Sequence, residues 1–187
     1  APERIIDRRL PPAPDQSAGD QEAKFIAPED WAVDVSRRNL ITFRINSADK
    51  VLMSTDRSIR VNEHYICDID DFDVKRLKEM IANPERKKTL PETEMKDITM
   101  PDGSVRQFEV SKAMVSYGID RGTSYTAYTK GMEMIMTAYK ELREDFSKEV
   151  FGKPLAELTE TEMQTVYLAI PLIVSETTPK AVPQKDN

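Results

Sequence analysis

The sequence predicts an α+β domain with a mixed β-sheet of about five strands, helices packed on one face of that sheet, and one long amphipathic helix. Three observations support this prediction. Short segments rich in β-branched and aromatic residues are separated by turn-forming residues, as in strands and hairpins. Between residues 125 and 150, apolar side chains recur every three or four positions, which is the period of a helix. A chain of 187 residues is also long enough to bury a core.

The composition excludes several classes of protein. Lysine and arginine total 27 against 33 aspartates and glutamates, and this acidic balance argues against a nucleic-acid partner, which needs a basic surface. One cysteine, Cys67, and one histidine, His64, exclude a disulfide framework and a histidine-rich metal site, so we expect no cofactor. The longest apolar run, Tyr167 to Val174, is much shorter than the roughly 20 residues of a membrane span.

Both ends of the chain differ in composition from the middle. Residues 1–38 hold five of the twelve prolines and few apolar residues, so we expect an extended, proline-containing leader or tether. Residues 177–187, which contain two prolines and two lysines, are predicted to form a disordered tail. Residues 39–176 remain as the folded domain. We also expect the chain, which starts at Ala1, to be a fragment or a processed product.

The first half of the domain predicts a hairpin and a short helix. Residues 39–45 and 51–53 form strands around a turn at 47–50, and residues 58–61 add a strand or lead into a loop. Apolar residues spaced three and four apart predict a helix over 74–81. Its start is favoured by the preceding Asp70 and Asp71, and its end by Asn83 before Pro84. Residues 85–95 read as a loop.

A second hairpin and a central strand follow. Residues 97–100 and 105–110 flank the turn-forming sequence Pro-Asp-Gly-Ser at 101–104. The mostly apolar run 113–119 predicts a central strand with both faces covered.

The strongest periodicity predicts a helix of about 26 residues with one apolar stripe. The stripe consists of Tyr125, Tyr128, Met132, Ile135, Tyr139, Leu142, Phe146 and Val150. Thr123 or Ser124 caps its start, and Gly152 closes its end. The stripe serves either as core packing on the sheet or as a seam between two copies of the chain.

The last elements are a short helix and a strand. Thr159 and Glu162 have the spacing of a capping box, which predicts a helix that ends before Pro171. Residues 172–174 then close the core as a short strand.

Two candidate metal sites are weak. His64 and Cys67 are spaced as two ligands, but zinc needs two more, so a loop histidine with a half-buried thiol is the simpler interpretation. The aspartates at 68, 70, 71 and 73 fail the calcium-loop pattern because Phe72 occupies a ligand position. Negative charge at a helix start explains them more simply.

The segment Asp120-Arg-Gly-Thr-Ser-Tyr125 joins the central strand to the long helix and is the best candidate for a partner- or ligand-binding loop. Its candidate residues are Asp120, Arg121, Thr123 and Tyr125. Residues 122–124 could cradle an anion at the helix start, although a turn with an N-cap is the commoner use of such residues. Without a nearby histidine or a carboxylate pair, general acid–base catalysis is not favoured, and we expect a non-enzymatic module.

Three sequence blocks stand in order in the second half of the chain. They are Asp120-Arg-Gly-Thr-Ser-Tyr-Thr-Ala-Tyr128, Ala138-Tyr-Lys-Glu-Leu-Arg143 and Phe151-Gly-Lys-Pro-Leu-Ala-Glu-Leu158. Together they resemble the longer-insert branch of the ExbD-type biopolymer-transport proteins, which are relatives of TolR. The first hairpin and the leading Leu10-Pro11-Pro12 are similar to the same family, so the resemblance covers most of residues 10–176.

The resemblance implies a function. ExbD-like proteins have one inner-membrane helix with an essential aspartate, which this chain lacks, and a periplasmic α/β domain, which residues 39–176 resemble. With an ExbB-like membrane protein they use the proton-motive force to move a TonB-like partner. The family also implies a homodimer, through an edge strand such as residues 172–174 or 39–45, and TolR relatives imply peptidoglycan binding as the alternative. The stretches 62–97 and 144–170 are longer than the compact family domain requires.

Overall fold

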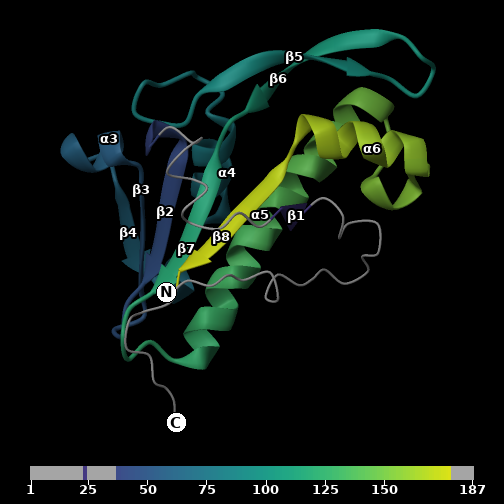
Figure 1. Ribbon diagram of the computed structural model, residues 1–187. Coiled ribbons are helices and arrows are strands. Elements are labelled where there is room, and N and C mark those ends of the chain that lie inside the picture. The colour runs from purple at the N-terminus through teal and green to yellow at the C-terminus, as the bar shows by residue number, and fades with distance from the viewer. Residues whose placement is uncertain (1–22, 25–36, 178–187) are drawn as a thin grey trace.

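The computed structural model describes residues 23–24 and 37–177 of the chain. Its main β-sheet has the strand order β1-β8-β7-β2-β3-β4 (Figure 1). The strands are β1 (Ala23–Lys24), β2 (Leu40–Ile45), β3 (Lys50–Ser54), β4 (Tyr65–Asp68), β7 (Met114–Ile119) and β8 (Leu172–Thr177). Strands β1, β8, β7 and β2 pair in parallel, whereas β3 is antiparallel to both of its neighbours. The sheet is mixed, and the predicted fold class is confirmed.

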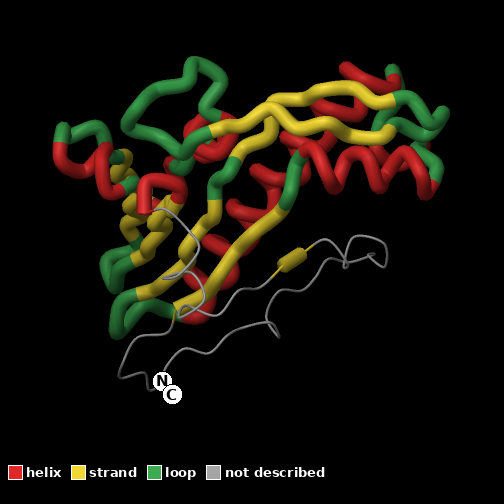
Figure 2. Tube along the Cα trace, turned by 45° about the horizontal axis from the view of Figure 1, so that its top comes forward, coloured by secondary structure: helices red, strands yellow, loops and turns green. Residues whose placement is uncertain are grey.

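Two helices cover one face of this sheet (Figure 2). The helices are α3 (Asp56–Arg60), α4 (Val74–Ala82), α5 (Tyr125–Phe151) and α6 (Glu160–Ala169), with 3-10 turns η1 (Arg37–Asn39), η2 (Ile69–Asp71) and η3 (Leu155–Glu157). Helices α4 and α5 pack on the sheet, and α6 packs on α5 and on a separate hairpin. In the described part of the chain, no helix combines the length and the apolar character that crossing a membrane requires.

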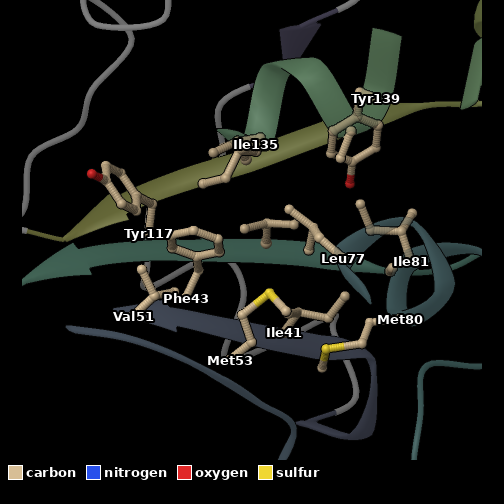
Figure 3. Packing of buried hydrophobic residues seen from close by; sticks show 14 of the residues in the cluster. Ile41, Phe43, Val51, Met53, Leu77, Met80, Ile81, Tyr117, Ile135 and Tyr139 are labelled. Atoms are coloured by element: carbon tan, nitrogen blue, oxygen red, sulfur yellow. The ribbon is translucent and has the colours of Figure 1, made fainter. Parts of the chain in front are cut away.

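The main core lies between the sheet and helices α4 and α5 (Figure 3). Along β2, Ile41, Phe43 and Ile45 are fully buried, and the alternate residues between them are half-buried. This period of two is that of a strand with one face on the core. The predicted β2–β3 hairpin is confirmed, and its turn is held by Asn46, whose Oδ1 accepts hydrogen bonds from the amides of Ala48 and Lys50.

The predicted stripe of α5 serves as core packing, but small and polar residues beside it are buried more fully than most of its members. Tyr128, Met132, Ile135, Tyr139 and Leu142 contact the main core, only Ile135 and Tyr139 of the eight are fully buried, and Tyr125 is 79% exposed. The residues that are buried along α5 include a series spaced by four that is mostly small or polar: Ala127, Gly131, Ile135, Tyr139, Arg143 and Ser147. Small residues are buried here because the helix lies very close to the sheet, as Gly131 shows below. The helix itself and its ends, Ser124 and Gly152, are as predicted.

The second predicted hairpin is present but does not join the main sheet. Strands β5 (Thr93–Thr99) and β6 (Val105–Ser111) form a two-stranded sheet of their own that extends over α6 (Figure 1). A second, smaller core lies beneath this hairpin. It contains Ile98, Val110 and Ala169, with Phe108, Phe146 and Ile170 packed against them. This core joins the hairpin to residues 144–170, which supply Phe146, Ala169 and Ile170.

One local prediction is wrong. Residues 58–60 form the end of helix α3, with Val61 as its C-cap, because Thr55 and Ser58 make a reciprocal capping box that starts a helix at Asp56. Strand β4, which pairs with β3, was not predicted, whereas His64 lies in the loop before it and Cys67 is half-buried, as expected. Helix α4 is as predicted, and Asn83 ends it in a left-handed conformation with φ of 46°.

The position of β2 also corrects a prediction. Residues 39–45 were expected to offer a free edge, but β2 lies between β7 and β3. The central strand β7 does lie inside the sheet, between β8 and β2. Among the described elements, helices cover only one of its faces, and the opposite face carries Ser116 and Gly118.

Candidate functional site: the Asp120 loop

The Asp120 loop connects the end of β7 to the start of α5. Because β2 and β7 are parallel and Ile45 pairs with Ile119, the loop lies over the carboxyl ends of both strands. The amide of Asp120 and the hydroxyl of Thr123 both donate to the carbonyl of Ile45, at 2.9 and 3.1 Å. These two bonds fix the loop to β2, at the sheet edge where open α/β sheets commonly bind ligands.

Asp120 is held by an arginine from the neighbouring strand. The Nη2 atom of Arg44 lies 2.5 Å from Oδ1 of Asp120, and both side chains are a little under half exposed. Arg44 pairs with Gly118 across the sheet, and a Cβ at Gly118 would lie 3.1 Å from Nη1 of Arg44. The absence of a side chain at Gly118 therefore leaves room for Arg44 to lie across β7 and reach Asp120.

The start of α5 uses its polar groups internally. Ser124 is the N-cap, and its Oγ accepts a hydrogen bond from the amide of Ala127 at 3.0 Å. The amide of Thr123 donates to the carbonyl of Asp120, and Gly122 has a φ of 84°, which favours glycine. The geometry is that of a turn followed by an N-cap, and both hydroxyls at the helix start already take part in hydrogen bonds.

Tyr125 begins a continuous series of ring contacts that leads into the core. Its ring lies 5.9 Å from that of Tyr128, which stacks at 5.5 Å on Tyr117, which in turn contacts Phe43 at 5.6 Å. The Tyr117 hydroxyl donates to the carbonyl of Tyr128, and burial raises the pKa of this phenol. Tyr125 thus presents an exposed aromatic surface that is supported from below by packed rings.

Arg121 completes the exposed part of the loop. Its side chain is exposed and forms no hydrogen bond or ion pair with any other described residue. Arginine and tyrosine are each enriched at the energetic centres of protein interfaces, because both bury a large area with a polar end. Of the four candidate residues, Asp120 and Thr123 hold the loop together, and Arg121 and Tyr125 are available to a partner.

The other two candidate sites do not assemble. Cys67 lies in β4 with its side chain packed on the main core, and among the described residues no three potential metal ligands come together. The aspartates have separate structural roles. Asp73 caps α4 by accepting from the amide of Lys75, and Asp68 and Asp70 pair with Lys50 and Lys130.

Sequence reasoning missed Arg44 as part of the site. The alternation of β2 places Arg44 on the face opposite the core, but nothing in the local pattern pairs it with a residue 76 positions later. A parallel pairing of the first strand with the strand before the long helix would have been the necessary signal.

Comparisons with family models, with curated proteins and with solved structures found no match. The resemblance described above therefore rests on the sequence blocks.

Proposed function

We propose that this chain is the periplasmic domain of an ExbD-like inner-membrane component of a proton-motive-force-driven, TonB-type transport system, and that it acts by protein–protein contact, not by catalysis. The observation that carries the proposal is that some residues of the Asp120 loop hold it in place while others are exposed. Asp120, Thr123 and Ser124 form internal bonds, whereas Arg121 and Tyr125 face solvent. The loop is also the first of the three blocks that resemble the family.

The proposal implies particular partners. An ExbB-like membrane protein would supply the motion, a TonB-like protein would receive it, and the chain would work as a homodimer. The outer edge of β8 offers a place for the dimer, because β1 pairs only with Leu172 and Ile173, and the rest of β8 has no second neighbour among the described strands.

The test is site-specific crosslinking in native cells. A photo-crosslinking amino acid replaces Tyr125 in the full-length gene product, and Leu168, which is 55% exposed on α6, receives the same substitution as a control. We expect crosslinks from position 125 to a TonB-like protein that change when an uncoupler collapses the proton gradient. Identical crosslinks with and without the uncoupler, or none above those of position 168, would contradict the proposal.

The second candidate is a TolR-like peptidoglycan-binding module. The exposed ring of Tyr125, supported by Tyr128, is the kind of surface that stacks on a sugar. Cosedimentation of the chain with purified peptidoglycan tests this. Retention that is lost in Tyr125→Ala supports the candidate, and no retention at low salt removes it.

A further inference from the structure

Strand β4 forms one edge of the main sheet. It pairs with β3 on one side, and no described element lies on its other side (Figure 1). An edge strand presents backbone N–H and C=O groups that can pair with another extended chain. The edge of β4 is thus open to strand addition from outside the described part of the molecule.

The strand is held rigidly from the core side. Tyr65 and Cys67 pack against the main core, and the Tyr65 hydroxyl accepts a hydrogen bond from the amide of Asp73 at 3.3 Å. The guanidinium of Arg76 lies 4.5 Å above the Tyr65 ring, and Phe72 contacts the ring edge on. An added strand would therefore meet a preformed template.

The outward side chain at the centre of β4 is apolar. Ile66 is 57% exposed, and it pairs across the sheet with the half-buried Leu52. Edge strands that are protected against pairing usually carry lysine or proline at such positions. Ile66 and Leu52 instead provide apolar contact area for the side chain of an incoming strand.

The surroundings of this edge carry more carboxylates than cations. Of the six carboxylates in residues 56–73, Asp56, Asp68 and Asp70 pair with Arg60, Lys50 and Lys130, and the other three form no ion pair with a described residue. Glu63 and Asp71 stand just before and just after the strand, and both are exposed. Such a field attracts a cationic segment and raises its rate of association.

The same charges disfavour a second copy of this chain. An antiparallel pair of β4 strands centred on Cys67, with side chains of the same face opposed, would place Glu63 opposite Asp71 of the other copy. Like charges directly opposite one another destabilise a strand pair. A basic partner has no such conflict.

We propose that the β4 edge is a docking site for an extended basic segment of a partner protein, in which apolar residues alternate with lysine or arginine. The segment adds a strand to the sheet, places an apolar side chain on Ile66 and Leu52, and sets its cations among the carboxylates that flank β4. This proposal does not depend on the function proposed above.

The test is a titration of the full chain, labelled with nitrogen-15, with the peptide acetyl-KVKVKVK-amide. We expect amide signals of Tyr65–Asp68 to shift and their hydrogen exchange to slow. Ile66→Lys should weaken binding about tenfold through lost apolar contact and added like charge. Leu168→Lys, at another exposed apolar residue, should leave binding unchanged.

A second peptide separates strand pairing from charge attraction. When proline replaces the central valine, the charge is kept but a ladder hydrogen bond is lost, so we expect no binding. Equal binding of the two peptides, shifts centred away from β4, or no effect of Ile66→Lys would overturn the proposal. So would a dimer in sedimentation experiments that Ile66→Lys abolishes, since the occupant would then be a second copy. Residues 4–10 of the chain itself, Arg-Ile-Ile-Asp-Arg-Arg-Leu, also combine arginines with apolar residues. Shifts of their signals on Ile66→Lys, without peptide, would assign the edge to this N-terminal segment and overturn the proposal as well.

Discussion

Gly131 determines how closely α5 approaches the sheet. A Cβ at this position would lie 2.3 Å from the Tyr117 hydroxyl and 2.4 Å from Cδ1 of Ile45, which is far inside any normal contact. Both neighbours are fixed, since Tyr117 donates to the carbonyl of Tyr128 and Ile45 is fully buried. The helix could not keep this position with any larger residue at 131.

Gly131→Ala should therefore destabilise the domain, although alanine normally favours a helix by about 1 kcal/mol over glycine. Overpacking of a rigid core costs about 1–3 kcal/mol, and we expect a net loss of unfolding free energy in urea denaturation followed by circular dichroism. In a Tyr117→Phe background the loss should be smaller, because the closest of the three contacts under 3.0 Å, that with the hydroxyl, is gone. A stabilised Gly131→Ala protein would show that α5 lies farther from the sheet.

Glu109 on β6 is tied to the loop after α4. Its two carboxylate oxygens accept from Nε and Nη2 of Arg86 at 2.6 and 2.7 Å, and the Thr93 hydroxyl also donates to it. Arg86, with a smaller effect from Thr93, lowers the pKa of Glu109 to about 2. This two-point contact connects the root of the hairpin to the main domain.

The sign of the pH dependence follows from that lowered pKa. The ordinary pKa of a glutamate is about 4.3, so the contact stabilises the folded state above that pH and is lost as the pH falls toward 2. In Arg86→Gln, a carbon-13 titration should find the Glu109 pKa moved up toward its ordinary value. Glu162 is the internal control, because its pKa is lowered by the Thr159 amide and by Lys153, not by Arg86. An unchanged pKa of Glu109 in this variant would mean that Arg86 is not its partner.

At the scale of elements, the β5–β6 hairpin and α6 form one unit with the end of α5. Phe108 on β6 contacts Phe146 on α5 edge to face at 5.2 Å, and Ile98, Val110 and Ala169 complete a small core. This core is far smaller than the main one. The unit should therefore open locally at a lower free energy than the sheet.

Phe108→Ala should loosen this unit selectively. Since Phe108 is half-buried, we expect a loss of about 2 kcal/mol, below the 3–5 kcal/mol typical of a fully buried phenylalanine. Hydrogen exchange followed by mass spectrometry should show faster exchange in β5, β6 and α6, with β2 and β7 unchanged. Met95→Ala, on the exposed face of the same hairpin, is the control. Uniformly faster exchange would mean that the two cores unfold together.

The elements that the sequence predicted correctly are those specified by local chemistry. The β2–β3 turn depends on Asn46, α4 ends at Asn83, and α6 starts with the Thr159–Glu162 capping box, all within a few residues of the pattern that predicted them. Strand β4 was not predicted because four residues are too short to show a clear alternation of apolar and polar side chains. Helix α3 was not predicted because Thr55 gives little sign in the sequence that it is a helix cap.

The most deeply buried residues of α5 could not be predicted because tertiary packing decides them. Hydrophobicity selects Met132 and Leu142, which pack on the core but are only half-buried, whereas the close approach of the helix to the sheet buries Gly131. For the same reason the position of the Asp120 loop was predictable from a strand–helix junction, whereas its ion pair with Arg44 was not. To predict either the buried residues of α5 or this ion pair, one must know which strands pair in the sheet.

At the scale of the whole molecule, the two candidate contact surfaces, the Asp120 loop and the β4 edge, belong to different strands of the main sheet. The β5–β6 hairpin precedes β7 and the Asp120 loop follows it, so the six residues of β7 place the hairpin and the loop about 20 Å apart. The β4 edge lies three strands away from β7. The carboxyl end of β4 lies at the same end of the sheet as the Asp120 loop, since Lys130 of α5 pairs with Asp70, so partners at the two surfaces would be separated by the width of the intervening strands.

Strand β8 should be the last element that the domain requires. Leu172 and Val174 are almost completely buried in the main core, and the carbonyl of Ile170 accepts two hydrogen bonds from the buried Arg143. A chain that ends at residue 170 loses both apolar side chains and the ladder with β7. Each large buried side chain contributes about 2–5 kcal/mol against a total stability of about 5–15 kcal/mol. We therefore expect no cooperative thermal unfolding of this chain by circular dichroism.

The matched chain of residues 37–177 tests the predicted domain boundaries, 39–176, from the other direction. It keeps β2 to β8 and every described residue of both cores, and it omits β1, which pairs with only two residues of β8. We expect it to unfold cooperatively, with a midpoint within a few degrees of the full chain, because two strand residues contribute little next to the main core. If it fails to fold while the full chain folds, the N-terminal segment is part of the domain and the predicted boundary at residue 39 is wrong.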